Sequence, residues 1–278
     1  MPANAHTLTR LDFSKPLVMG ILNVTPDSFS DGGRFNQLTP ARQHALQILE
    51  EGADIIDIGG ESTRPNAAPV AEQEELDRVI PVIEAIRQHS EVMISIDTSK
   101  AVVMREAVTA GANIINDVMA LRAEGALSVA AELKVPVCLM HMQGEPHTMQ
   151  SAPIYSDVVH EVKTFLEARV DACLAAGMSR DKLWLDPGFG FGKTVTHNLH
   201  LLRHLTEFKR LGFPLLVGLS RKSMIGALLN NAPVTERLPA SLALALIATQ
   251  SGANIVRVHD VKATVDALAM WQAVNGLA

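Results

Sequence analysis

The stretches EGADIIDIGG (51–60), AGANIINDV (110–118) and SGANIVRVHD (251–260) share one pattern, and this pattern decides the fold. In each stretch a glycine follows the end of a candidate helix, where glycine suits the left-handed conformation that ends a helix. A run rich in β-branched residues comes next and is apolar at consecutive positions, which is typical of a strand buried on both faces. The repeated unit is therefore a helix that leads through a short turn into a buried strand.

Short apolar runs of this kind recur along the chain and predict eight strands. Their ranges are Leu17–Asn23, Asp54–Gly59, Met93–Asp97, Ile114–Asp117, Val135–His141, Leu183–Asp186, Pro214–Ser220 and Ile255–His259. Helical stretches lie between and after them, at Pro40–Glu51, Ala71–His89, Ala101–Ala110, Gly125–Leu133, Asp157–Ala176, Asn198–Leu211, Pro239–Ser251 and Ala263–Val274. Strands that alternate with helices in this way indicate parallel βαβ units.

Eight strand–helix pairs in about 260 residues are typical of a (β/α)8 TIM barrel, which is an α/β fold. A doubly wound open sheet is the alternative, but it would normally carry a glycine-rich fingerprint at its first turn. The sequence contains no linker rich in proline, glycine and serine, and no block of charge divides it. We therefore expect residues 1–278 to form a single domain, with residues 1–15 as an N-terminal extension.

The composition limits the possible partners. The chain is 47% hydrophobic, which supplies a core, and its formal net charge is −6. An acidic balance disfavours nucleic acid as the main partner, because phosphate backbones bind to a basic surface. Two cysteines cannot form a disulfide framework. The N-terminal residues lack the apolar segment of a signal peptide, and the most apolar run is far shorter than the roughly 20 residues that span a bilayer. We expect a cytoplasmic protein that acts on small molecules, with no membrane partner.

Polar side chains gather where the expected strands end. They are Asn23, Glu61, Thr63, Arg64, Asp97, Asn116, His141, Asp186, Ser220, Arg221, Lys222, Arg257 and His259. One such residue alone would more often be an ordinary loop residue, but here every strand contributes. In a barrel these ends converge on the face that carries catalytic residues. Buried carboxylates need a cation or a hydrogen-bond donor beside them, so the convergence predicts an active site.

Two loops and two misleading motifs complete the pattern. The long loops after the first and second strands, 23–33 and 59–65, carry glycines and hydroxyls that suit segments ordered by substrate. The run GFGFGKT (188–194) looks like a phosphate-binding loop, but Pro187 stands where the Walker motif needs its first glycine. His197, His200 and His204 share a helix face without a metal-binding spacing, so we interpret them as surface residues.

Eight segments together resemble the dihydropteroate synthase family over nearly the whole chain. They are MGILNVTPDSFSDGG (19–33), DIGGESTRP (57–65), SIDTSK (95–100), INDV (115–118), MHMQG (140–144), LDPGFGFGKT (185–194), GLSRKSMIG (218–226) and RVHD (257–260). One departure is Asn66, where the family usually has glycine. Because asparagine tolerates the left-handed conformation, we expect a slightly stiffer second loop and no loss of activity.

The resemblance implies a reaction: 6-hydroxymethyl-7,8-dihydropterin diphosphate and p-aminobenzoate give 7,8-dihydropteroate and diphosphate, with Mg²⁺ as cofactor. It assigns the catalytic residues Asp97, Lys222 and Arg257, and it places the pterin against Asp97, Asn116, Met140, Asp186, Lys222 and Arg257. It places the diphosphate against Asn23, Thr63, Arg257, Val258 and His259. The p-aminobenzoate would contact Phe29, Arg64, Pro65, Phe191, Ser220 and Arg221. The chemistry agrees, because carboxylates and an amide suit the N–H groups of a pterin edge. Asn23 would supply a hard oxygen ligand to Mg²⁺.

We expect a dissociative mechanism, in which diphosphate leaves before the aniline nitrogen attacks and Asp97 steadies the pterin cation. Sulfonamides are expected to compete with p-aminobenzoate. Other possibilities are a methyltetrahydrofolate-binding methyltransferase barrel, a paralogue that binds pterin without catalysis, and a Schiff-base aldolase that uses Lys222. The resemblance also implies a homodimer. The apolar late helices Pro239–Ser251 and Ala263–Val274 could supply its interface, or they could equally be apolar because they pack on the barrel.

Overall fold

The structure is a computed structural model that describes residues 11–25, 34–63, 67–144, 149 and 153–276. Its eight strands form one parallel sheet in the order β6-β5-β4-β3-β2-β1-β8-β7. A bridge between Leu185 and Leu215 joins the two edges, so the sheet closes into a barrel. The strands are β1 (Leu17–Asn23), β2 (Ile55–Gly59), β3 (Met93–Asp97), β4 (Ile114–Asp117), β5 (Val137–Met140), β6 (Leu183–Asp186), β7 (Leu216–Val217) and β8 (Ile255–Val258). The predicted TIM barrel is confirmed.

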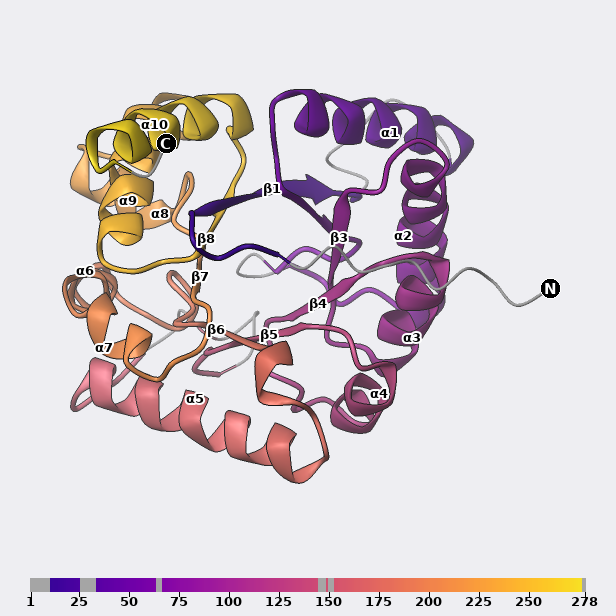
Figure 1. The fold of residues 1–278 in the computed structure, drawn as a ribbon, viewed down its shortest axis with the longest axis horizontal. Helices are drawn as coiled ribbons and strands as arrows, with labels where there is room; N and C mark the ends of the chain where they lie inside the picture. The colour runs from indigo at the N-terminus through magenta and orange to yellow at the C-terminus, as the bar shows by residue number, and fades with distance from the viewer. Residues whose placement is uncertain (1–10, 26–33, 64–66, 145–148, 150–152, 277–278) are drawn as a thin grey trace.

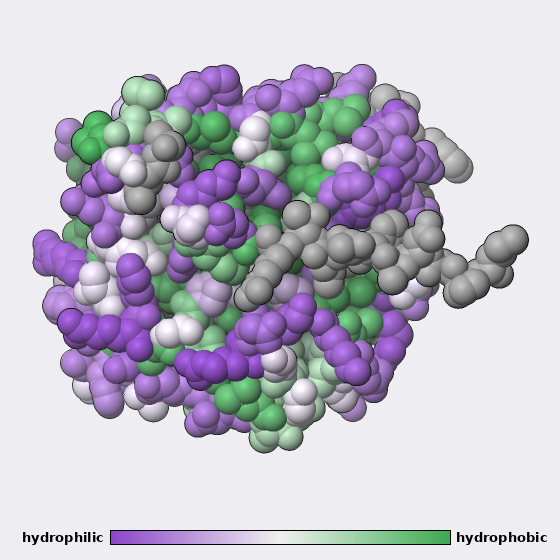
Figure 2. Space-filling model, in the orientation of Figure 1, coloured by the Kyte–Doolittle hydropathy of each residue, from purple (hydrophilic) through white to green (hydrophobic). Residues whose placement is uncertain are grey.

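The helices surround the strands as an outer ring (Figure 1). They are α1 (Arg34–Glu50), α2 (Glu72–Arg87), α3 (Ala101–Ala110), α4 (Ala126–Leu133), α5 (Val158–Ala175), α6 (Val195–Arg203), α7 (Leu205–Lys209), α8 (Ser223–Leu228), α9 (Leu238–Gln250) and α10 (Val261–Val274). Figure 2 shows hydrophilic and hydrophobic residues interspersed on the face seen in Figure 1. None of the helices in the described part of the chain is long and apolar enough to cross a membrane.

The glycines of the repeated sequence unit have the conformation that the pattern predicts. The backbone angle φ is +94° at Gly52, +121° at Gly111 and +106° at Gly252. At Gly111 the backbone N–H closes the last turn of α3 on the carbonyl oxygens of Ala107 and Val108. Each glycine therefore ends a helix and turns the chain toward the next strand, as expected.

Most predicted boundaries differ from the structure by at most three residues, but α1 begins at Arg34 where the prediction began at Pro40. Three other differences divide, shorten or add an element. The predicted helix Asn198–Leu211 is divided at His204, whose φ of −108° leaves the helical region and separates α6 from α7. The predicted strand Pro214–Ser220 shortens to the two residues of β7. Pro214 has no backbone N–H to donate at its start, and at its end only Leu216 and Val217 pair with β8. The short helix α8 was not predicted, because six residues are too few to show an apolar period.

Side chains that point into the barrel form layers. The layer at the N-terminal end is apolar and is made of Leu17, Met19, Ile55, Met93, Ile114, Cys138, Trp184, Leu216 and Ile255. Phe13 packs against this layer from outside the barrel, with its ring edge-to-face on Trp184 at 5.6 Å between centroids. The packed layer closes one end of the barrel. Side chains nearer the carboxyl ends of the strands are polar, so the site lies at the opposite end.

Candidate active site

Arg257 on β8 lies at the centre of the polar layer. Its Nε donates to Oδ2 of Asp57 on β2 at 2.6 Å, and its Nη2 donates to Oδ2 of Asp97 on β3 at 2.7 Å. Asn116 on β4 adds a hydrogen bond from Nδ2 to the same oxygen of Asp57 at 3.2 Å. One guanidinium therefore joins two carboxylates across the barrel, and an amide completes the group.

The electrostatics of this group follow from burial. Burial raises the pKa of Asp97 to about 7, with Arg257 opposing the shift and the carboxylates of Asp57, Glu75 and Asp117 adding to it. Burial alone would lower the pKa of Arg257, but the adjacent carboxylates outweigh it and raise that pKa above its ordinary value. The guanidinium stays charged at all working pH values, whereas Asp97 titrates near neutrality. Within the described residues, Oδ1 of Asp57 has no hydrogen-bond partner, so one acceptor of the group is unused.

A second part of the site is built by the loop after β6 and the start of α8. Asp186 ends β6, and its Oδ1 accepts from the backbone N–H of Gly188 at 2.7 Å. Lys222 holds its Nζ 4.3 Å from the ring centroid of Phe191. Burial raises the pKa of Asp186, and burial together with Arg257 lowers the pKa of Lys222 to about 8. Met140 is buried among methionines, and Phe191 packs against the same apolar cluster. Carboxylates, an amide, a titratable ammonium and an apolar cluster thus lie together at the carboxyl ends of the strands.

The glycine-rich loop 188–192 is held by Lys193, which lies under the loop and not at a phosphate site. The Nζ of Lys193 donates to the carbonyl oxygens of Gly188 at 2.8 Å and Phe191 at 2.9 Å, and to Nδ1 of His141 at 2.9 Å. Burial, reinforced by Lys193, lowers the pKa of His141 to about 2, so this ring is a neutral acceptor. Gly188 has φ +72°, and a Cβ there would lie 1.8 Å from the carbonyl oxygen of His141. The interpretation of this loop as a barrel loop agrees with these contacts.

The loops after β7 and β8 contribute a third part. The Oγ of Ser220 lies 3.2 Å from the backbone N and 3.1 Å from Nδ1 of His259. Burial and the charge of Arg257 lower the pKa of His259 to about 4, so its ring is neutral near pH 7. Arg221 adopts φ +56°. Its Nε donates to Oδ2 of Asp260 at 2.9 Å, and its Nη2 donates to Oδ1 of the same carboxylate at 2.5 Å. The charge of Arg221, in the loop after β7, is therefore already partnered by Asp260 in the loop after β8.

Asn23 and Asp97 lie on either side of Gly59. The register pairs Asn23 with Gly59, and Gly59 with Asp97. A Cβ on Gly59 would lie 3.7 Å from Oδ2 of Asp97 and 3.8 Å from Oδ1 of Asn23, so the two oxygens are close together above this glycine. No cluster of three or more His, Cys, Asp or Glu side chains suited to a metal occurs in the described ranges. The donor set fits Mg²⁺ held by one amide oxygen, with most ligands supplied by phosphate and water.

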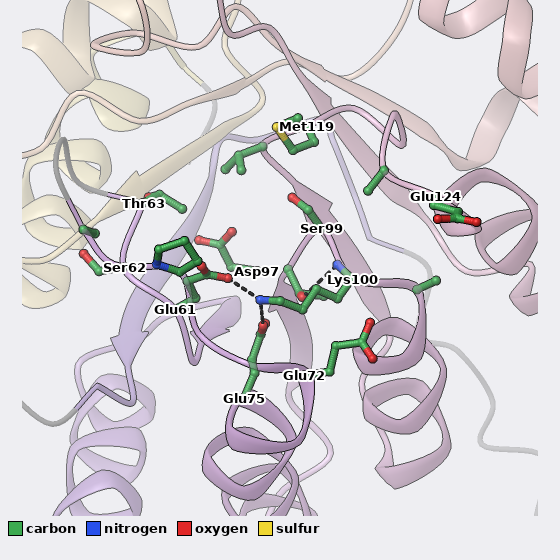
Figure 3. Close-up of a pocket in the computed structure, with 16 residues that line it drawn as sticks. Glu61, Ser62, Thr63, Glu72, Glu75, Asp97, Ser99, Lys100, Met119 and Glu124 are labelled. Carbon is green, nitrogen blue, oxygen red and sulfur yellow. Dashed lines mark hydrogen bonds and ion pairs between the residues drawn. The ribbon is translucent and has the colours of Figure 1, made fainter. Parts of the chain in front are cut away.

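A cavity of about 330 Å³ opens beside Asp97, between the loops that follow β2, β3 and β4. Thr63 and Asp97 line it, together with Lys100, Glu61 and Glu75 (Figure 3). Lys100 lies between Glu61 and Glu75 and forms ion pairs with both. The mouth of the barrel thus extends into a charged recess on this side.

The structure brings together most of the site predicted from the sequence and adds residues to it. The expected residues Phe29, Arg64 and Pro65, and the departure Asn66, lie outside the described residues. Asp57, Glu75, Lys100 and Lys193 were missed. Asp57 could have been found, because it lies on the inward face two residues before Gly59 in a strand that is otherwise apolar. Glu75 could also have been noticed, because it shares the buried face of α2 with Val79 and Ile86. Lys100 and Lys193 lie outside the helices, and no spacing in the sequence indicates them.

Comparison with known proteins agrees with this geometry. A family model described as pterin binding enzyme matches residues 19–259. The dihydropteroate synthase of Escherichia coli (strain K12) is 59% identical over 265 residues, which are 95% of this chain and 94% of the relative. A crystal structure of the Yersinia pestis dihydropteroate synthase with a sulfonamide drug superposes with a TM-score of 0.91 at 56% identity and covers 96% of both chains. The Xanthomonas albilineans dihydropteroate synthase in complex with 7,8-dihydropteroate gives a TM-score of 0.88 at 50% identity, over 96% of this chain and 97% of that chain. The resemblance carried by the eight motifs is confirmed, and this chain belongs to the dihydropteroate synthases within the pterin-binding enzyme family.

Proposed function

We propose that this dihydropteroate synthase binds its pterin in the polar layer of the barrel and joins it to p-aminobenzoate by a dissociative route. The observation that carries the assignment is the group of Arg257, Asp57 and Asp97, with Asn116 and Asp186 beside it. A pterin edge presents several N–H donors in one plane, and carboxylate and amide oxygens are the matching acceptors. The unused oxygen of Asp57 leaves acceptor capacity in the same layer.

Each pterin-facing residue has a separate role. Asp97, Asn116 and Asp186 accept from the N–H groups, and Lys222 donates to the acceptor atoms of the ring. Arg257 offers a planar cation that stacks on a heterocycle and reaches an adjacent phosphate. Met140 supplies the apolar wall, because it is buried where the methionine cluster meets Phe191.

The diphosphate is assigned to the other side of Arg257. Thr63, His259 and the backbone of Val258 would contact its oxygens, and Asn23 would contribute an oxygen to Mg²⁺. When bound, Mg²⁺ would neutralise charge on the leaving diphosphate. Because the ring of His259 is neutral near pH 7, it acts as a hydrogen-bonding group and Arg257 supplies the nearby positive charge.

The reaction begins with loss of diphosphate. The bond between the exocyclic methylene carbon of the pterin and the diphosphate oxygen breaks, and its electron pair leaves with diphosphate. The ionised carboxylate of Asp97 stabilises the cation that remains, in a site where fixed charges replace solvent. The aniline nitrogen then forms the carbon–nitrogen bond with its lone pair and loses one proton to solvent. No side chain forms a covalent intermediate.

The p-aminobenzoate is assigned to the rim between Phe191 and Ser220. The Phe191 ring lies over Lys222 and gives an apolar surface next to the pterin. Ser220 offers a hydroxyl to the carboxylate. Arg221 lies next to it, and its guanidinium would have to share its charge between Asp260 and the carboxylate of p-aminobenzoate. The residues Phe29, Arg64 and Pro65 are proposed to complete the slot from the first two loops.

One experiment tests the proposed function. The purified protein is mixed with the pterin diphosphate, p-aminobenzoate and Mg²⁺, diphosphate release is followed by a coupled phosphate assay, and the product is identified by mass spectrometry. We expect 7,8-dihydropteroate in a 1:1 ratio to diphosphate, and loss of turnover on addition of EDTA that excess Mg²⁺ restores. Diphosphate release without p-aminobenzoate, at the full rate and with water as acceptor, would contradict a synthase.

We propose a homodimer that works in the cytoplasm, where both small-molecule substrates are available. Support for the dimer is the apolar exposure on the adjacent helices α9 and α10, where Ile247, Met270 and Val274 expose 46%, 66% and 87% of their surface. Sedimentation of the wild-type protein and of Met270→Glu distinguishes a dimer from a monomer.

A further inference from the structure

Lys100 lies at the junction between the charged recess and Asp97. It is the residue before α3 and follows Asp97 by three positions. Its Nζ forms ion pairs with Glu61, which follows β2, and with Glu75 on α2 (Figure 3). The side chain of Glu75 is completely buried, and those of Lys100 and Glu61 expose 21% and 28%. A single ammonium is therefore the ion-pair partner of two carboxylates in a position with little access to solvent.

The same contact fixes the base of the second loop. Oε1 of Glu61 accepts from the backbone N–H of Val70 at 3.1 Å, so the side chain of Glu61 ties the start of the second loop to Val70. Arg78 on α2 donates to the carbonyl oxygen of Gly60 at 2.6 Å and fixes the adjacent residue. Lys100 joins this base to α2 and α3. Thr63, which is assigned to the diphosphate, lies two residues beyond Glu61.

Charges from several elements act on Asp97. The carboxylates of Asp57 on β2, Glu75 on α2 and Asp117 on β4 raise its pKa in addition to burial, and Arg257 on β8 lowers it. Asp97 in turn raises the pKa of Lys222 against the larger effect of burial, so that ammonium also faces it. The carboxylate of Asp117 is already satisfied, because it accepts from Ser99 at 2.5 Å and from the backbone of Met119 and Leu121 at 2.7 Å each. The charge of Glu75 has Lys100 as its ion-pair partner.

Lys100 keeps its proton at the pH of the reaction. Burial lowers its pKa, but hydrogen bonds to Glu61 and Glu75 outweigh burial, and the net direction is upward. One oxygen of Glu75, Oε1, has no hydrogen-bond partner in the described part of the chain. Without Lys100, this buried carboxylate would have no ion-pair partner in the cavity that it lines together with Asp97.

We propose that Lys100 is a positioning residue for the synthase reaction: its ammonium neutralises Glu75 behind Asp97, so that Asp97 can carry its own negative charge toward the pterin, and through Glu61 it fixes the base of the loop that carries Thr63. The proposal rests on the role proposed for Asp97. The pH range of the reaction then depends on Lys100, which lines the charged recess beside Asp97.

The test is the pH profile of kcat/KM for the pterin diphosphate, at saturating p-aminobenzoate. In Lys100→Met the carboxylate of Glu75 loses its counter-charge, so the acid limb moves up by about one pH unit, a shift typical of an added charge at a partly dehydrated site. We expect kcat/KM to fall about ninefold at pH 6 but only about twofold at pH 8, as a limb that moves from about pH 7 to about pH 8 requires. In Glu75→Gln a negative charge disappears and the acid limb moves to lower pH.

Two matched controls separate charge from packing. Lys100→Arg keeps the positive charge and should retain the wild-type limb, and the double variant Lys100→Met/Glu75→Gln should return the limb toward wild type. Melting temperatures establish that each variant is folded at the assay temperature. An acid limb that stays fixed in both Lys100→Met and Glu75→Gln, with activity lowered equally at all pH values, would overturn the proposal. A wild-type enzyme without product or without an acid limb would instead contradict the function proposed for Asp97.

Discussion

Arg257 and Asp97 face each other across the barrel, on β8 and β3, with 2.7 Å between Nη2 and Oδ2. The two strands are separated in the sheet by β1 and β2, so the contact crosses the polar layer and does not follow the ladder. A permanent cation here meets a carboxyl whose pKa burial raises to about 7. The protonation of Asp97, and with it the charge of the pair, therefore changes near neutral pH.

The wild-type enzyme should have a bell-shaped pH profile of kcat/KM for the pterin diphosphate, since this constant reports groups of the free enzyme. Asp97, with a pKa of about 7, must be ionised to stabilise the pterin cation, so activity falls as the pH decreases below that value. Lys222, with a pKa lowered to about 8 by burial, must be protonated to donate, so activity falls as the pH increases above that value. Initial rates from pH 5 to pH 10 locate both limbs, and a flat profile between pH 5 and pH 7 would contradict the role of Asp97.

Asp97→Asn should lower kcat/KM roughly a hundredfold, as expected when one preorganised charge is removed from a site of this kind, and it should also remove the acid limb. The amide keeps the size of the side chain, so the fold should be retained. Asp54→Asn serves as a control because Asp54 also carries a carboxylate, which accepts from the backbone of Val18 away from the polar layer. Near-normal turnover by Asp97→Asn, with pterin still bound in a calorimetric titration, would show that another group stabilises the cation.

Arg257→Met should destabilise the protein in addition to abolishing activity. Asp57 is completely buried, and the substitution leaves both it and Asp97 without their guanidinium partner. Removing one partner of a buried ion pair typically costs about 3–5 kcal/mol of unfolding free energy. Urea denaturation at pH 8 measures the loss. At pH 5 the loss should be smaller, because the raised pKa of Asp97 means that this carboxyl is then protonated and no longer a bare charge.

The sequence predicted the barrel well because its signal is local and repeated. Each strand is a short apolar run, and each helix of the repeated unit ends at a glycine whose positive φ is observed, as at Gly111. The inward direction of Asp97, Asn116 and Asp186 followed from their place at the strand ends. The end of β7 and the break at His204 depend on single backbone conformations that leave no periodic trace.

The electrostatic support of the site was harder to predict. Asp57 lies within an apolar strand. Its role as a partner of Arg257 is seen only in the hydrogen bond that joins the two side chains across the barrel. Glu75 and Lys100 lie on and before different helices, 25 positions apart, and meet only after both helices have packed on the sheet. Helical spacing places Glu75 on the buried face of α2 with Val79 and Ile86, but it does not identify Lys100 as the partner of this carboxylate. Contacts of this kind depend on tertiary packing.

Gly188→Ala should disable the loop that carries Phe191. The φ of +72° at this residue strains any L side chain, and the added Cβ would also lie 1.8 Å from the carbonyl oxygen of His141. Gly177→Ala is a matched control, because its φ is +86° but no atom lies within 4 Å of the new Cβ. Strain alone costs about 1–2 kcal/mol, so Gly177→Ala should lose that much stability and retain its KM for p-aminobenzoate. Gly188→Ala should lose more stability and raise that KM at least tenfold. Equal losses of stability and equal KM values in the two variants would show that the backbone near His141 moves to accept the new Cβ without a further loss of stability.

Phe13→Ala tests whether the two ends of the barrel are energetically separate. The ring of Phe13 packs edge-to-face on Trp184 beneath the apolar layer, at the end remote from Arg257 and Asp97. Truncation of a half-buried aromatic side chain in such a contact should cost about 2 kcal/mol of unfolding free energy. Ile154→Ala, at a side chain that is 76% exposed, should stay within about 0.5 kcal/mol of wild type. Because the packed apolar layer separates Phe13 from the polar layer, KM for both substrates should be unchanged in Phe13→Ala. A rise in KM for the pterin diphosphate, measured well below the melting temperature of the variant, would show that the apolar layer transmits strain to Asp97.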